Sequence, residues 1–144
     1  MAASAANKGI LFSWGKAATA GLAGVGSAAV VSLIYGLIVN AIFGAPMTPN
    51  PQTGELQPVI AAQYGVAAAV FTIVGAFIFM FMMRAGGEKA IRNFIIVGVV
   101  GLILSFVTVL QPGIATDDRI ILAVVHVVAA AAAIPAMVLT YQRR

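Results

Sequence analysis

The sequence predicts an all-α integral membrane protein, a bundle of four transmembrane helices. Two observations carry this prediction. Of the 144 residues, 62% are hydrophobic and only 8% are charged, whereas a soluble domain carries about 25% charged residues. All charged residues also lie outside four long apolar stretches, residues 17–43, 58–83, 93–110 and 120–140. We therefore expect residues 1–144 to form a single transmembrane domain with short cytoplasmic tails at 1–16 and 141–144.

Each stretch has a length suited to a membrane-spanning helix. About 20 apolar residues, rising roughly 1.5 Å each, cross about 30 Å of hydrocarbon. The first stretch, from Ala17 to Phe43, is longer than the roughly 7 to 15 apolar residues of a signal peptide, so we interpret it as a retained helix. The third, from Asn93 to Leu110, is the shortest, and we expect its helix to begin earlier, near Glu88. None of the stretches alternates polar and apolar residues as a β-barrel strand does.

Turn-forming residues separate the stretches. The first connection, residues 44–54, is rich in Pro, Gly and Asn, which do not continue a helix, and it predicts a loop. Pro58 suits the first position of the second helix. Thr116, Asp117 and Asp118 stand before the fourth stretch, where a capping oxygen and negative charge favour a helix N-terminus.

Positive charges predict the orientation in the membrane, because Lys and Arg accumulate in cytoplasmic segments. Arg119 is the only one of them in the first or third connection. The others lie in the tails and the second connection: Lys8, Lys16, Arg84, Lys89, Arg92, Arg143 and Arg144. We therefore predict that both termini are cytoplasmic and that these residues meet anionic lipid headgroups. They form no patch with interleaved aromatic residues, so we predict no nucleic-acid partner.

Small residues recur at helical spacing in every stretch, as they do where membrane helices contact one another. These stripes are Gly21, Gly24, Ala28, Ser32 and Tyr35; Ala61, Gly65, Ala68, Thr72 and Ala76; Gly98, Gly101, Ser105 and Thr108; and His126, Ala130, Ala133 and Met137. We expect the stripes to face inward in a compact bundle, with the aliphatic faces toward lipid. Pro135 removes the backbone hydrogen bond to Ala131, so we expect it to bend the fourth helix and to free a carbonyl for a neighbour.

Polar side chains within the spans are the first place to look for function. The predicted orientation places a candidate polar cluster near the outer surface: His126, Ser105, Tyr35, Gln63 and Thr108. His126 is the only Asp, Glu, Lys, Arg or His residue inside a span. Its imidazole N–H could bond to Ser105, Tyr35 or a backbone carbonyl and set the helix register, or it could accept a proton or contact a ligand in a cavity open to the outside. The third alternative is a metal or haem ligand, which needs a symmetric dimer because one His completes neither site.

The sequence contains no recognisable catalytic machinery. It has no Cys, which excludes thiol catalysis and iron–sulfur clusters. No span carries the carboxylate that many proton-coupled transporters use, and there is no phosphate-binding Gly loop. We therefore predict a structural or accessory membrane component that is not an enzyme and has no catalytic, cofactor-binding or metal residues. The alternative is a small-molecule or lipid binding or transport protein that uses the polar cluster as its site. Its predicted partners are the lipid bilayer and either a second copy or a larger membrane complex.

The second half of the chain carries a characteristic succession of residues: Ser105, Gln111, Pro112, Thr116, the run from Leu122 to His126, and Ile134 with Pro135. Over residues 105–136 the chain thereby resembles a family of small four-helix membrane proteins, mainly of actinobacteria, known only as a domain of unknown function. The resemblance implies a multi-pass protein of the bacterial inner (plasma) membrane, and it suggests that His126, Ser105 and Pro135 belong together. It implies no activity.

Overall fold

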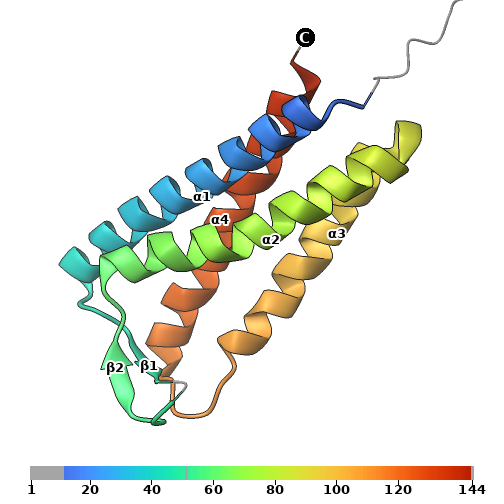
Figure 1. The fold of residues 1–144 in the computed structure, drawn as a ribbon. Coiled ribbons are helices and arrows are strands. Elements are labelled where there is room, and N and C mark those ends of the chain that lie inside the picture. The colour runs from blue at the N-terminus through green and yellow to red at the C-terminus, as the bar shows by residue number, and fades with distance from the viewer. Residues whose placement is uncertain (1–11, 51, 144) are drawn as a thin grey trace, which may run out of the picture.

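The computed structural model describes residues 12–50 and 52–143. The described chain forms four α-helices: α1 (Trp14–Ile42), α2 (Ala61–Ala85), α3 (Ala90–Ser105) and α4 (Thr116–Gln142) (Figure 1). Two 3-10 turns, η1 (Gly87–Lys89) and η2 (Phe106–Thr108), flank α3. With η2 added to α3, all four helices are long and apolar enough to cross a membrane. The predicted fold class, a four-helix membrane protein, is confirmed.

The first connection contains a β-hairpin where composition predicts only a loop. Strand β1 (Met47–Pro49) pairs antiparallel with β2 (Leu56–Pro58). Pro58 therefore ends a strand instead of beginning α2, because its position next to Met47 in the pairing register holds it in extended backbone. The Oδ2 atom of Asp118 accepts the Met47 N–H at 3.1 Å and ties the hairpin to α4.

The start of α4 also differs from the prediction. Thr116, Asp117 and Asp118 lie within the first turn of α4, and Ala115 occupies the cap position without a side-chain capping bond. The two carboxylates still lie at the positive end of the helix dipole, which favours them. One of them, Asp118, also bonds to the hairpin.

Helix α1 is the centre of the packing, and its small face contacts both α2 and α4. Gly21, Gly24, Ala28 and Ser32 are buried. A Cβ atom added to Gly21 would lie 3.0 Å from the Cβ of Ala76, and Gly24 packs directly on a methionine of α4. The small stripe predicted for α1 is therefore a true helix contact surface.

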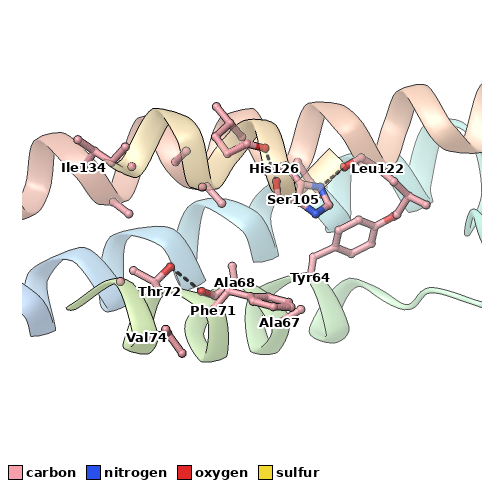
Figure 2. Close-up of a pocket in the computed structure, with 18 of the residues that line it drawn as sticks. Tyr64, Ala67, Ala68, Phe71, Thr72, Val74, Ser105, Leu122, His126 and Ile134 are labelled. Carbon is pink, nitrogen blue, oxygen red and sulfur yellow. Dashed lines mark hydrogen bonds between the residues drawn. The ribbon is translucent and has the colours of Figure 1, made fainter. Parts of the chain in front are cut away.

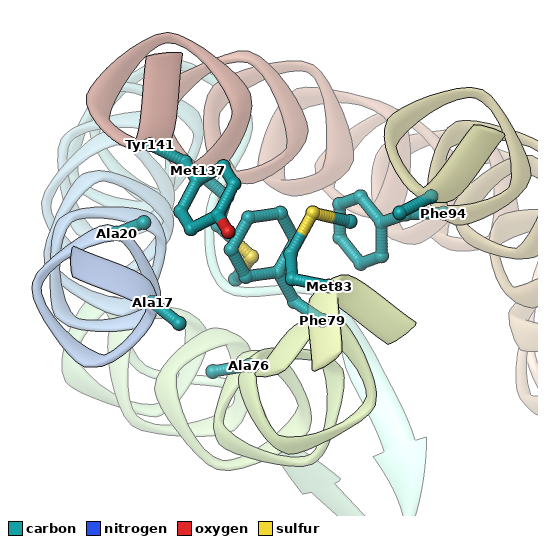
Figure 3. Packing of buried hydrophobic residues seen from close by; sticks show 9 residues of the cluster. Ala17, Ala20, Ala76, Phe79, Met83, Phe94, Met137 and Tyr141 are labelled. Atoms are coloured by element: carbon teal, nitrogen blue, oxygen red, sulfur yellow. The ribbon is translucent and has the colours of Figure 1, made fainter. Parts of the chain in front are cut away.

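The hydrophobic core lies at the end of the bundle where α1 begins and α4 ends (Figure 3). We call this the basic end, because Lys16, Arg84, Lys89, Arg92 and Arg143 lie there; the opposite end is the hairpin end. The Phe79 ring lies at the centre of the core, with ring centroids 4.8 Å from Phe94 and 5.5 Å from Tyr141, both edge to face. Residues of all four helices meet in this cluster.

Helix α3 packs on the other helices mainly at the basic end, where Ala90 and Phe94 are its buried residues. Toward the hairpin end it separates from α2 (Figure 1). A Cβ atom added to Gly98 would lie 2.8 Å from Cδ1 of Ile134, but a Cβ atom added to Gly101 would meet no atom within 4 Å. The expectation of a compact bundle is therefore wrong for α3. Lipid is as good a partner as protein for its Val, Ile and Leu side chains, so nothing drives the whole helix inward.

Large hydrophobic side chains face outward around the bundle, as expected in lipid. Examples are Val30, Leu37, Phe71, Phe77, Ile103 and Leu104. Polar contacts supplement the small-residue packing. The Ser27 hydroxyl of α1 lies 3.2 Å from the Ala132 carbonyl oxygen of α4 and 3.1 Å from the Gly24 carbonyl oxygen of its own helix, so the two acceptors share its one proton. Pro135 lies inside α4. The α4 carbonyl that a neighbouring helix contacts is that of Ala132, which the Ser27 hydroxyl approaches, and not that of Ala131, whose hydrogen bond Pro135 removes.

Candidate functional site

A groove of about 600 Å³ lies between α2, α3 and α4 (Figure 2). It follows from the divergence of α3, since the space between α2 and α3 widens away from the core. Thr48 and Gln57 of the hairpin line one end, and Phe94 and Met137 of the core line the other. Its volume falls within the roughly 300–1,000 Å³ typical of small-molecule sites.

The groove walls are uncharged and mostly apolar. No Asp, Glu, Lys or Arg is among the lining residues. Small residues from all three helices widen it: Ala67, Ala68, Gly75, Gly98, Gly101, Ala129, Ala130 and Ala133. At Gly75 and Gly101 an added Cβ would meet no atom within 4 Å, so packing within the described chain does not require these glycines. Phe71 and Ile78 on the α2 wall are exposed, which leaves the groove open toward the lipid.

His126 lies half-buried on the groove wall near its hairpin end. Its Nδ1 atom is 2.6 Å from the Leu122 carbonyl oxygen, one turn earlier in α4. A carbonyl only accepts hydrogen bonds, so this contact places a proton on Nδ1 and leaves Nε2 of the neutral ring as an acceptor.

The Nε2 atom of His126 faces a hydroxyl whose proton is used elsewhere. The Thr108 Oγ1 atom lies 3.4 Å from Nε2, but it also donates to the Ser105 carbonyl at 2.7 Å. A threonine hydroxyl has one proton. The shorter bond to Ser105 therefore leaves the lone pair of Nε2 without a strong donor among the described residues.

The structure brings three members of the predicted cluster together and separates the other two. His126 and Ser105 line the groove, whereas Thr108 contacts Nε2 of His126 at 3.4 Å from outside the lining. The Ser105 hydroxyl donates to the Leu102 carbonyl of its own helix at 2.6 Å. The Tyr35 hydroxyl instead donates to the Ile121 carbonyl at 2.8 Å, joining α1 to α4 outside the groove lining.

Gln63, the fifth predicted residue, serves the start of α2. Its Oε1 atom accepts the N–H of Ile60 at 2.8 Å, which satisfies a backbone donor at the helix N-terminus. The side chain is exposed and lines the groove at the same end as His126. Gln63 and His126 therefore line the same groove, but in the described chain no hydrogen bond joins the Gln63 side chain to His126, Ser105 or Thr108.

Tyr64 is a groove residue that the sequence prediction omitted from the cluster. It is only 4% exposed, and within the described chain its hydroxyl has no hydrogen-bond partner. In Figure 2 its ring extends from α2 toward Leu122 of α4. A buried hydroxyl without a partner costs about 1–3 kcal/mol. Its spacing from Ala61 and Ala68 places Tyr64 on the inward face of α2, and that signal was available in the sequence.

Tyr64 differs from the other polar atoms that are buried without a partner in the described chain. These are Ser32 Oγ, Asn40 Oδ1 and Arg119 Nε. None of these three residues lines the groove between α2, α3 and α4. Among these atoms, only the Tyr64 hydroxyl belongs to a residue that lines the groove, and the hydroxyl itself is enclosed by the protein.

A metal site does not form from the part of the chain that the structure describes, where no three His, Asp or Glu side chains come together. His126 is the single histidine of the sequence. The metal or haem role of His126 remains a prediction that requires a second chain.

Comparison with known proteins identifies the family. A search of curated proteins and a search of solved structures found no match to this chain. The model of a family of unknown function, DUF6069, matches residues 12–143, which extends well beyond the resemblance at residues 105–136. The four apolar helices make the chain a multi-pass membrane protein by length and composition. The chain belongs to DUF6069, a family of unknown function.

Proposed function

We propose that this protein binds a lipid-like molecule in the groove between α2, α3 and α4, and that it does so without catalysing a reaction. The observation that carries the proposal is an uncharged groove of about 600 Å³ within the membrane-spanning helices, open toward the lipid and polar at one end. A molecule with an apolar body enters such a groove from the bilayer without crossing water. The hydrophobic and small lining residues contact the body, and His126 contacts a polar group.

Two glycines on the groove walls have empty space beside them, which favours a bound molecule in the groove over glycines that serve only close helix packing. Gly24 packs directly on Met137, and a Cβ on Gly36 would lie 2.6 Å from Cδ2 of Tyr64. Gly75 on α2 and Gly101 on α3 have no such neighbour, and both line the groove. Their effect is to keep the groove wide.

Filling the groove tests the proposal. Gly75→Leu places a large side chain in open space on the α2 wall, so it should fold and reduce the lipid that copurifies with the protein, as counted by mass spectrometry. Gly26→Leu on α1 is the matched control, because a Cβ there also meets no atom within 4 Å and Gly26 lies outside the groove. Equal amounts of bound lipid in the two variants would refute the proposal.

A structural or accessory role in a larger membrane complex, or in a homo-oligomer, is the second candidate. It is favoured by α3, whose exposed Val, Ile and Leu side chains offer a helix surface with few partners in this chain. Cross-linking in native membranes tests it: cross-links from α3 to a second copy or to another protein would support it, and their absence would count against it. The bacterial plasma membrane is the proposed location for either role.

A further inference from the structure

We propose that the groove holds one extended acyl chain of about 18 carbons, with its polar head at the hairpin end and its terminal methyl group at the core end. This inference rests on the proposed lipid-binding function and adds the length, the number and the direction of the bound chains. Three properties of the groove carry it: its length, its volume and the difference between its two ends.

The length of the groove follows from the helices that form its walls. The lining extends from Gln63 to Ile78 on α2 and from Leu122 to Met137 on α4. At a rise of 1.5 Å per residue, each of these segments is about 22 Å long. The three backbone bonds of one extended peptide residue span at most about 3.6 Å, so an extended hydrocarbon chain advances about 1.2 Å per bond and needs about 18 carbons to cover 22 Å.

The volume of the groove gives the number of chains. A methylene group is close in size to a water molecule, whose share of the liquid volume is about 30 Å³. The groove volume of about 600 Å³ therefore holds about 20 such groups. Two chains of this length side by side would need about 1,100 Å³. The length and the volume thus agree on a single chain.

The hairpin end of the groove is the polar end. Thr48 and Gln57 lie opposite each other in the hairpin and line this end together with Gln63. The hydroxyls of Thr72 and Ser105 also belong to lining residues, but they donate to carbonyls of their own helices. A hydroxyl has one proton, so these two groups have none to give to a bound molecule.

The core end of the groove is apolar and closed. Phe94 and Met137 line it and are only 4% and 1% exposed, because both belong to the hydrophobic core at the basic end. A chain that enters with its head at the hairpin end therefore stops with its methyl group against these two side chains. The distance between the polar end and this stop sets the preferred chain length.

A series of 1-monoacylglycerols with one head group tests the preferred length. Lauroyl, pentadecanoyl, stearoyl and lignoceroyl chains, of twelve, fifteen, eighteen and twenty-four carbons, compete for the full-length protein in detergent and are counted by native mass spectrometry. All of these tails already avoid water in the micelle, so differences in binding report the fit to the groove. Stearoylglycerol should bind about tenfold more tightly than the lauroyl and lignoceroyl compounds, which underfill and overfill the groove.

Gly75→Leu should shorten the preferred chain. Gly75 lies about 18 Å along α2 from Gln63, so a side chain there leaves room for about 15 carbons. The variant should bind pentadecanoylglycerol best and stearoylglycerol about tenfold more weakly than the wild type does. Gly26→Leu, on α1 and outside the groove, is the matched control and should keep the preference for stearoylglycerol.

Photo-cross-linking tests the direction of the chain. A stearoyl probe with a diazirine beside its terminal methyl group should label residues near Phe94 and Met137. The same probe with the diazirine beside its ester should label residues near His126. The opposite labelling pattern would overturn the proposed direction.

The outcomes separate this inference from the proposed function. If all chain lengths bind equally and Gly75→Leu weakens them all, the groove binds lipid but the chain-length inference is wrong. A preference for stearoylglycerol that persists in Gly75→Leu at reduced affinity also overturns the inference. If Gly75→Leu weakens none of the compounds, the lipid-binding function itself is wrong.

Discussion

The ring of Tyr64 packs against the backbone of Gly36: a Cβ atom added to Gly36 would lie 2.6 Å from Cδ2 and 3.0 Å from Cγ of Tyr64. The glycine on α1 thus allows the ring of a tyrosine on α2 to lie close against the backbone of α1. The edge-to-face contact with Tyr35, at 6.1 Å between ring centroids, holds the ring from a second side.

Gly36→Ala should therefore destabilise the protein and displace Tyr64. The added methyl overfills a closely packed contact, which typically costs about 1–3 kcal/mol. The loss is measurable as a lower midpoint of thermal or denaturant unfolding in detergent. Gly26→Ala is the control, because open space surrounds that position and alanine favours the helix. A Gly36→Ala variant as stable as Gly26→Ala would show that the contact is not tight.

The hydrogen bond from Ser27 to Ala132 predicts a small, specific loss. Ser27→Ala removes a hydroxyl whose proton is shared between the Ala132 carbonyl of α4 and the Gly24 carbonyl of α1. Interhelical bonds in membranes contribute about 0.6 kcal/mol on average, so the expected loss is of this size or smaller. Thr19→Ala is the comparison, since the Thr19 hydroxyl bonds to Gly15 within the same helix. Unfolding measurements should show a loss for Ser27→Ala alone, and an equal change in both variants would contradict this assignment.

Charge and hydropathy predicted the membrane-spanning fold because a charged residue within lipid is costly, so the spans are visible as gaps in the charge distribution. The small stripe of α1 was predicted for a similar reason, since close helix contact needs small side chains. The prediction for α3 failed because a glycine at a helix contact and a glycine on a groove wall look alike in sequence. Gly24 packs on Met137, whereas Gly101 faces open space.

The candidate site was predicted in part. Helical spacing and the short connection between α3 and α4 place Ser105, Thr108 and His126 at similar depth. The pairings were not predictable, because several acceptors lie within reach of each polar group: His126 bonds to Leu122 of its own helix, and Tyr35 reaches Ile121. The groove could not be predicted either, since it depends on the angle between α2 and α3.

Asp118 should control the hairpin that lines the end of the groove. Asp118→Ala removes the acceptor for the Met47 N–H, so this amide should exchange its hydrogen about tenfold faster, equivalent to about 1.4 kcal/mol of opening free energy. Asp118→Asn keeps an acceptor oxygen and should retain most of the protection. Asp117→Ala is the control, because Asp117 is exposed. Unchanged exchange at Met47 in Asp118→Ala would show that the bond does not anchor the hairpin.

The predicted orientation can be tested with single cysteines, because the sequence contains none of its own. Glu55→Cys lies in the hairpin connection and Lys89→Cys at the basic end, and both native residues are exposed. The distribution of Lys and Arg predicts the basic end in the cytoplasm. A membrane-impermeant thiol reagent added to intact cells should therefore label Glu55→Cys and spare Lys89→Cys, while permeabilised cells should show both labelled. The reverse pattern in intact cells would place the hairpin and the polar end of the groove on the cytoplasmic side, so a lipid would then reach His126 from the inner leaflet.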